Sequence, residues 1–175
     1  MKKILILICP LLFTACENFP AITVGTTAEM NFDINKSDLN YEGSRLLDPS
    51  TNETFEKYKG KLNDVIVTKV TYTITKFDGP ATQTASANFF VADGDGNGQQ
   101  TLASFSNVNL SSALNTETDM SISSTVATQL GQYILQAPNK ATVSFTGSVN
   151  EAPVKFSVKV KFYYDLKTRL IGTND

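Results

Sequence analysis

The segment from residue 154 to residue 166 alternates apolar and polar side chains without interruption, and no other feature of the sequence constrains the fold as strongly. The apolar residues at every second position are Val154, Phe156, Val158, Val160, Phe162, Tyr164 and Leu166. A period of two places them all on one side of an extended strand, whereas a helix would scatter them around its circumference. The segment therefore predicts a long β-strand with one buried face, on whose opposite face Ser157 should meet the solvent.

Other segments with the same period predict five further strands. We expect them near residues 26–34, 66–75, 83–92, 99–109 and 143–149. Their expected buried residues, in chain order, are Ala28, Met30, Phe32, Ile34, Ile66, Val70, Tyr72, Ile74, Ala85, Ala87, Phe89, Val91, Leu102, Val108, Val143, Phe145 and Val149. Gly147 inside the last of these strands predicts a bulge. Residues 36–49 are rich in Asn, Ser, Asp, Gly and Pro, which predicts a loop.

Two segments carry helical signals instead. Ser50-Thr51-Asn52-Glu53 matches a capping box, in which the first and fourth side chains bond to each other's backbone amides. Phe55 and Tyr58 follow at helical spacing, so we expect a helix near residues 51–60 with these two rings in the core. A second helix is expected over residues 121–136, with its apolar face covering one end of the sheets. Its apolar residues recur every fourth position: Ile122, Val126, Leu130 and Ile134.

Short strands, short turns and one or two short helices predict a mainly β domain. The architecture we expect is an antiparallel β-sandwich, immunoglobulin-like in shape, with a curved half-barrel as the alternative. About 160 residues remain once a leader is set aside, which is enough chain for a single hydrophobic core.

The first sixteen residues, MKKILILICPLLFTAC, carry a signal of another kind. Lys2 and Lys3 precede an apolar run of about ten residues, roughly half the length that a membrane-spanning helix needs. The sequence Leu12-Phe13-Thr14-Ala15-Cys16 that follows resembles the lipobox of bacterial lipoproteins, with Phe13 where leucine is commonest. The resemblance implies cleavage before Cys16, attachment of a diacylglyceryl group to its thiol, and acylation of its new amino group.

We therefore expect a lipoprotein signal peptide over residues 1–15, the lipidated Cys16 and a tether over residues 16–25, and the β-sandwich domain over residues 26–175. An ordinary secretory signal cleaved after Ala15 is the alternative. Several acyl chains together hold a protein firmly on a membrane. No acidic cluster of the kind that marks some surface-exported lipoproteins follows Cys16. The expected location is therefore the bacterial outer membrane, facing the periplasm, with exposure at the cell surface as the alternative.

The order of elements in the chain also carries a resemblance. A leader and a first strand are followed by Lys57-Tyr58-Lys59 in a helix and Lys69-Val70-Thr71-Tyr72-Thr73-Ile74 in a strand. This plan resembles that of small uncharacterised β-sandwich lipoproteins of the Bacteroidetes type. The resemblance implies no activity.

Composition narrows the chemistry that the chain can perform. It has no histidine and no tryptophan, and its only cysteines are Cys9 and Cys16. These absences exclude a Ser-His-Asp triad, a histidine-ligated metal and, once the leader is removed, a structural disulfide. The 15 basic residues fall to 13 without Lys2 and Lys3, which against 17 acidic residues gives a net charge of −4. With no basic stretch, we expect no nucleic-acid partner.

The segment Asp93-Gly94-Asp95-Gly96-Asn97-Gly98 resembles the first half of a calcium loop. Asp93, Asp95 and Asn97 would supply oxygen ligands at alternate positions, with glycine at the sixth. The twelfth position, where such loops carry a bidentate glutamate, is Ser104. We therefore expect a plain hairpin turn and no cofactor, and keep weak calcium binding as the alternative.

Lysines recur on the polar side of the last predicted strand, at Lys155, Lys159, Lys161 and Lys167. One interpretation is an anion-binding stripe for lipid head groups or acidic glycans. The preferred interpretation is a solvated face on which the lysines discourage edge-to-edge aggregation.

The acidic residues do not predict an enzyme. A carboxylate can replace histidine as an acid or base only if burial raises its pKa, and these residues fall in loops, caps and polar strand positions: Glu29, Asp33, Glu53, Glu56, Glu117 and Asp119. We expect a non-enzymatic accessory or interaction subunit of a cell-envelope complex, with the membrane and an envelope protein as partners. A glycan- or lipid-binding module is the second hypothesis, and a carboxylate hydrolase is a distant third.

Overall fold

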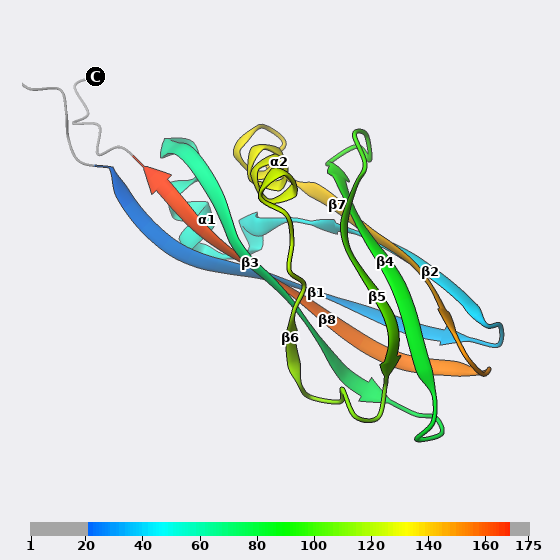
Figure 1. The fold of residues 1–175 in the computed structure, drawn as a ribbon. Coiled ribbons are helices and arrows are strands. Elements are labelled where there is room, and N and C mark those ends of the chain that lie inside the picture. The colour runs from blue at the N-terminus through cyan, green and yellow to red at the C-terminus, as the bar shows by residue number, and fades with distance from the viewer. Residues whose placement is uncertain (1–20, 169–175) are drawn as a thin grey trace, which may run out of the picture.

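The computed structural model describes residues 21–168, which form two four-stranded sheets packed face to face (Figure 1). One sheet has the strand order β1-β8-β3-β6, the other β2-β7-β4-β5, and every pairing between strands is antiparallel. The strands are β1 (Ile22–Lys36), β2 (Asn40–Leu47), β3 (Leu62–Phe77), β4 (Thr84–Asp93), β5 (Gln100–Asn109), β6 (Glu117–Asp119), β7 (Ala141–Val149) and β8 (Val154–Thr168). The predicted antiparallel β-sandwich is confirmed.

The connectivity is that of a jelly roll. Consecutive strands cross from one sheet to the other at every step except β4 to β5, which pair as a hairpin. This alternation produces the interleaved orders of the two sheets, whereas immunoglobulin sandwiches join their strands in another order. The immunoglobulin-like comparison therefore holds for the layered shape and not for the path of the chain.

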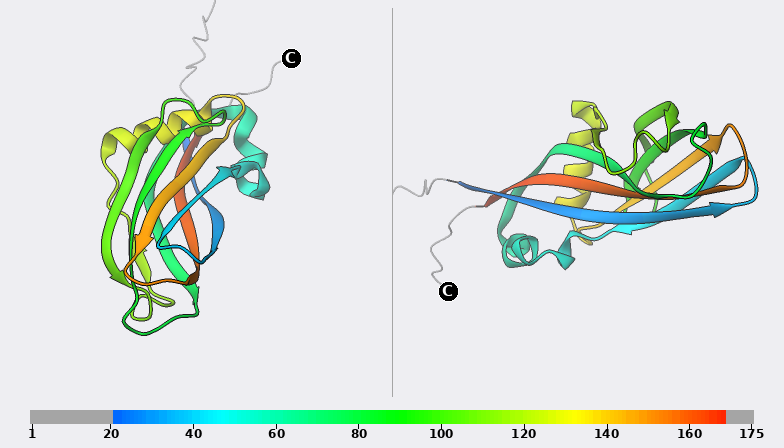
Figure 2. Two further views of the ribbon diagram at one scale, coloured as in Figure 1. Left: turned by 90° about the vertical axis from the view of Figure 1, so that its right-hand side faces the viewer. Right: turned by 90° about the horizontal axis from the view of Figure 1, so that it is seen from below.

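Strands β1 and β8 pair along their whole length, from Ile22 opposite Thr168 to Lys36 opposite Val154. Figure 2 shows them side by side from one end of the sandwich to the other. The described chain therefore starts and stops at one end, which we call the terminal end. At about 3.3 Å per residue, the 15 residues of β1 place the opposite, distal end roughly 50 Å away. β1 also begins at Ile22, inside the stretch predicted to be tether.

The distal end is formed by turns that are hydrogen-bonded to one another. Gln83 is fully buried there, and its amide nitrogen donates to the carbonyl oxygens of Glu151 and Pro153 at 2.6 and 3.0 Å. The backbone amide of Val149 donates to the carbonyl of Leu39 at 2.9 Å. These bonds tie the turn at residues 37–39 and the turn at 78–83 to the one at 150–153. The distal end is therefore a connected surface.

The core lies between the sheets, and the apolar residues of β8 that define its period are all buried, as predicted. Ser157 departs from that prediction. Only 9% of it is exposed, and its hydroxyl lies 2.5 Å from the Oδ1 atom of Asp33 on β1. Because β1 and β3 flank β8 on both sides, a small side chain in the middle strand is covered by its longer neighbours.

Helix α2 (Ser124–Leu135) is capped at its N-terminus by Ser123, whose hydroxyl accepts the amide hydrogen of Val126. It contacts β3 of one sheet and β4, β5 and β7 of the other, so its apolar face closes the gap between them, as predicted (Figure 1). Gly131 makes this close approach feasible. A Cβ atom there would overlap the carbonyl oxygen of Val65 on β3.

Three local predictions were wrong. Residues 36–49 are not a loop, because Asn40–Leu47 pairs with β7 as strand β2. Ile66 is not in the core: the pairing of β3 shifts between Val67 and Lys69, which leaves Val65 and Val67 buried and Ile66 36% exposed. Gly147 forms no bulge, since its strand keeps an unbroken register with both neighbours.

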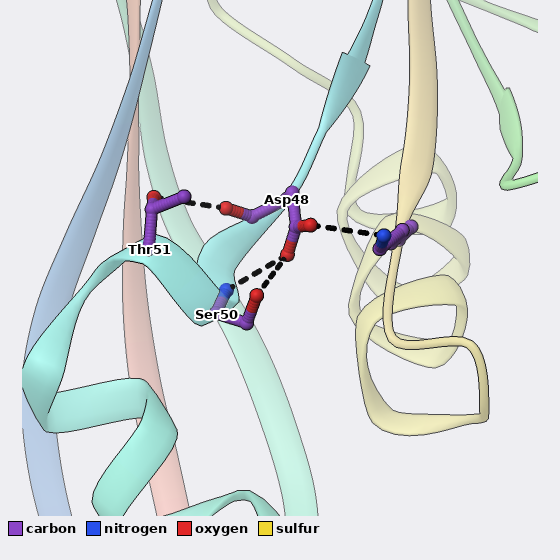
Figure 3. Close-up of polar contacts among 4 residues, drawn as sticks. Asp48, Ser50 and Thr51 are labelled. Atoms are coloured by element: carbon purple, nitrogen blue, oxygen red, sulfur yellow. Dashed lines mark hydrogen bonds and ion pairs between the residues drawn. The ribbon is translucent and has the colours of Figure 1, made fainter.

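The capping box was also wrong, although helix α1 (Glu53–Tyr58) lies where it was expected and buries Phe55. Its cap is Asn52, whose side-chain oxygen accepts from the amides of Thr54 and Phe55. Ser50 instead belongs to the preceding 3₁₀ turn (Pro49–Thr51). There the carboxylate of Asp48 accepts from the backbone amide and the hydroxyl of Ser50, as Figure 3 shows.

Candidate functional site

The outer face of the β1-β8-β3-β6 sheet, which we call the charged face, carries the predicted lysine stripe. The structure pairs each of its lysines with a carboxylate from a neighbouring segment. Glu29 on β1 lies between Lys159 and Lys161, at 3.7 and 3.4 Å. The other pairs are Lys155 with Asp78 at 2.7 Å and Lys167 with Asp64 at 3.4 Å. These carboxylates offset the positive charge that an anionic ligand would need.

Tyr163 occupies the middle of the charged face. Its hydroxyl donates to Glu117 on β6 at 2.8 Å, and the amines of Lys69 and Lys161 lie over its ring at 5.8 and 5.1 Å. The bond from Tyr163 lowers the pKa of the Glu117 carboxyl below its ordinary value. A carboxyl group with a lowered pKa stays ionised near neutral pH and is a poor proton donor. Glu117 therefore contributes to a charged network on the surface.

The Asp93 loop is the turn of the β4–β5 hairpin. One carboxylate oxygen of Asp93 accepts from the backbone amides of Asp95 and Asn97 at 3.0 and 2.7 Å. Asp93 therefore stabilises the turn with an oxygen that a calcium loop would direct at the ion. Within residues 21–168, no group of three or more histidine, cysteine, aspartate or glutamate side chains is placed to hold a metal. Weak calcium binding by Asp93, Asp95 and Asn97 stays the alternative to a plain hairpin turn.

The outer face of the second sheet differs in character and in shape. A hollow of about 610 Å³ opens on it at the distal end, over β2, β7 and β4. We call it the polar hollow and define it by the side chains of Asn40, Glu42, Ser86, Asn88, Thr146 and Ser148. Lys36 at the end of β1 and Asp38 from the β1–β2 connection also line it.

Strand register arranges the polar hollow in two rows. Ser148 on β7 pairs with Asn40 on one side and Ser86 on the other, which forms the first row. Two residues along, Thr146 is flanked in the same way by Glu42 and Asn88. Because side chains alternate across a strand, both rows point outward from the sheet.

Five of the six side chains that define the polar hollow have no hydrogen-bond or ion-pair partner within residues 21–168. Of the six, only Ser86 is engaged within residues 21–168, where its hydroxyl oxygen accepts the amide hydrogen of Asn107 at 3.0 Å. No hydrogen bond or ion pair is made in that part of the chain by the side chains of Asn40, Glu42, Asn88, Thr146 and Ser148. This is the reverse of the charged face, where the lysines and carboxylates satisfy one another.

Tyr41 lies beneath the polar hollow and spans its three strands. From β2 its ring lies over Gly147 on β7, and its hydroxyl donates to the carbonyl oxygen of Ser86 on β4 at 3.0 Å. Burial raises the pKa of the Tyr41 hydroxyl well above its ordinary value, so the group remains a donor. The ring also contacts Phe145 and Phe156, which fix it in the core.

The sequence did not point to the polar hollow. Only Tyr41 and Leu47 are buried among the residues of β2, so its period is too weak to predict a strand. The one available signal was Gly147, a glycine within an otherwise alternating strand, which indicates the close approach of another group as well as a bulge.

Cys16 lies outside the described residues, so the predicted lipid attachment stays a prediction. No helix within residues 21–168 is long and apolar enough to cross a membrane.

Comparison with known proteins gives no family. No protein-family model matches the chain, and no curated protein matches it. Among solved structures, desmodium yellow mottle tymovirus matches all of both chains with a TM-score of 0.38 and 11% identity. A turnip yellow mosaic virus structure matches across 89% of this chain and 99% of its own, with a TM-score of 0.38 and 9% identity. The structure of the infectious bursal disease virus Gt strain matches across 87% of this chain and 34% of its own, with a TM-score of 0.35 and 10% identity. Likenesses this distant carry no argument about function.

Proposed function

We propose that the chain is a lipid-anchored, non-enzymatic accessory protein of the bacterial cell envelope that binds another envelope component through its distal end. The proposed anchor is Cys16, and the proposed location is the outer membrane, facing the periplasm.

One observation carries the proposal: β1 starts and β8 ends at the terminal end, whereas the polar hollow lies at the distal end. A lipid on Cys16 would precede Ile22 by only a few residues and would therefore tether the terminal end. The polar hollow, beside Lys36 at the other end of β1, would then be held roughly 50 Å from that tether. This arrangement suits a protein that reaches from a membrane to a partner.

A non-enzymatic role is supported by how the carboxylates are used. The chain has no histidine to act as a general base. Glu29 is paired with lysines, Glu117 accepts from Tyr163, and Asp48 caps a turn. The two carboxylates that line the polar hollow, Asp38 and Glu42, are both exposed, whereas a glycosidase needs two acids in different environments.

The test is affinity purification of the tagged protein from detergent-solubilised membranes, in parallel with two variants. Asn88→Arg places a bulky charge in the polar hollow, and Asn31→Arg places the same charge on the exposed outer side of β1. We expect a stoichiometric envelope component with the wild type and with Asn31→Arg, and its loss with Asn88→Arg. The proposal would be overturned if the two variants recovered the same amount of the component, or if the wild type recovered no component.

A further inference from the structure

We infer that the polar hollow binds an uncharged glycan. This inference rests on the proposed function and deepens it, because it names the chemical class recognised at the distal end.

The side chains of the polar hollow match the chemistry of sugar hydroxyls. Each hydroxyl both donates and accepts a hydrogen bond, and so do the amides of Asn40 and Asn88 and the hydroxyls of Thr146 and Ser148. The carboxylate of Glu42 accepts only, and its two oxygens can take hydrogens from neighbouring hydroxyls. The set therefore offers donors and acceptors side by side, which a polyhydroxylated ligand can satisfy.

The size and spacing of the polar hollow suit an oligosaccharide. Adjacent strands lie about 4.8 Å apart and the two rows about 7 Å apart, so the polar groups form a two-dimensional array. The hollow's 610 Å³ falls inside the range of about 300–1,000 Å³ that is common for ligand pockets.

Charge argues against an anionic ligand. The charged side chains at the hollow are Lys36, Asp38 and Glu42, and their sum is negative. A phosphate or an acidic sugar would need an excess of positive charge, ideally from arginine. The lysines of the charged face lie on the other sheet and are paired with carboxylates, so they cannot supply it.

The lining also argues against an acyl chain and against a protein partner in the hollow. Three apolar side chains line it: Tyr41 is only 5% exposed, and Ala87 and Phe105 are half-buried. Apart from Gly147, the other lining residues are polar, so most of the surface that a lipid tail would meet is polar. Protein interfaces have an apolar, aromatic-rich centre. The exposed large hydrophobic residues within residues 21–168 all lie outside the hollow: Ile22, Leu39, Leu46, Ile66 and Leu114.

The experiment measures binding of the lipidated, detergent-solubilised protein to immobilised oligosaccharides. The probes are neutral gluco-, manno- and galacto-oligosaccharides, with sulfated and sialylated glycans as the anionic arm. The variants are Asn88→Ala and Glu42→Gln in the polar hollow and Asn31→Ala on the outer side of β1. Thermal melts of all variants confirm that each is folded.

We expect at least one neutral oligosaccharide to bind. Loss of one hydrogen bond worth about 1 kcal/mol should weaken binding about fivefold in Asn88→Ala, and Asn31→Ala should stay within about twofold of the wild type. Binding confined to anionic glycans, no binding, or equal binding by Asn88→Ala and Asn31→Ala would overturn the inference. The affinity purification can separate the two proposals. If the component that the wild type recovers and Asn88→Arg loses is a protein, the glycan inference is wrong and the proposed function stands.

Discussion

The ring of Tyr41 lies so close over Gly147, its cross-strand partner, that any side chain at position 147 would overlap it. This contact ties β2, which has few buried residues of its own, to the centre of its sheet. It also provides a fixed base beneath the side chains of the polar hollow, which stand on the other side of the same strands.

The first prediction is that Gly147→Ala lowers the free energy of unfolding by about 1–3 kcal/mol, because the added methyl group must displace a packed ring. Gly60→Ala is the matched control, since nothing lies within 4 Å of a Cβ atom built there. Urea denaturation of both variants measures the difference. Equal stabilities would show that the Tyr41 ring does not occupy this position.

The second prediction concerns neighbouring residues of β8. Phe156→Ala should cost about 3–5 kcal/mol, since its buried ring packs edge-on against Tyr41. Ser157→Ala should cost about 1–2 kcal/mol, more than a solvent-facing serine would, because a part-buried bond to the carboxylate of Asp33 is lost. Ser104→Ala, at an exposed position of β5, serves as the control. A Ser157→Ala variant as stable as the control would contradict this contact.

The third prediction follows from the pKa of Asp48. Burial raises this pKa, but bonds from Ser50 and the Lys140 amine, at 3.0 Å, outweigh it and hold the value below the ordinary 3.8. A lowered pKa in the folded state stabilises the protein above the unfolded-state pKa, and this contribution is lost as the pH falls through the folded-state pKa.

The stability of the wild type should therefore exceed that of Asp48→Asn at pH 7, and the gap should narrow as the pH falls from about 5 to below 3. Denaturation of both proteins across this range measures it. A gap that stays constant or widens on acidification would contradict the capping geometry in Figure 3.

The fourth prediction is that calcium changes the stability little. Asp93 already accepts two backbone amides within its turn, and Ser104 stands where a calcium loop has its bidentate glutamate. Melting temperatures with millimolar calcium and with a chelator should differ by no more than about two degrees. Asp93→Ala should lower the melting temperature equally in both buffers. A rise of about five degrees with calcium that Asp93→Ala removes would establish a calcium site.

The sequence predicted the fold where burial is one-sided. The period of β8 held because one face of that strand packs on the core along its whole length. Phe55 and the apolar face of α2 were predicted for the same reason. The strand β2 was missed because it lies at the edge of its sheet and buries few residues, and local sequence does not encode its pairing with β7.

The charged face could be predicted in part from the sequence, whereas the polar hollow could not. Lys159 and Lys161 were placed correctly on one face, since alternation along one strand determines it. Their partner Glu29 could not be predicted, because it lies on β1, far away in sequence. The polar hollow depends on three strands and two cross-strand rows, so no single segment contains its pattern.

The proposed lipid anchor at Cys16 would give the terminal and distal ends their roles, so lipidation of Cys16 is the central claim to test. The direct measurement is metabolic labelling of cells with a clickable fatty acid, comparing the wild type with Cys16→Ala. We predict that the wild type is labelled and sediments with the membranes, and that Cys16→Ala is unlabelled and keeps its leader or becomes soluble. Labelling of Cys16→Ala equal to that of the wild type, or no labelling of either protein, would contradict the account.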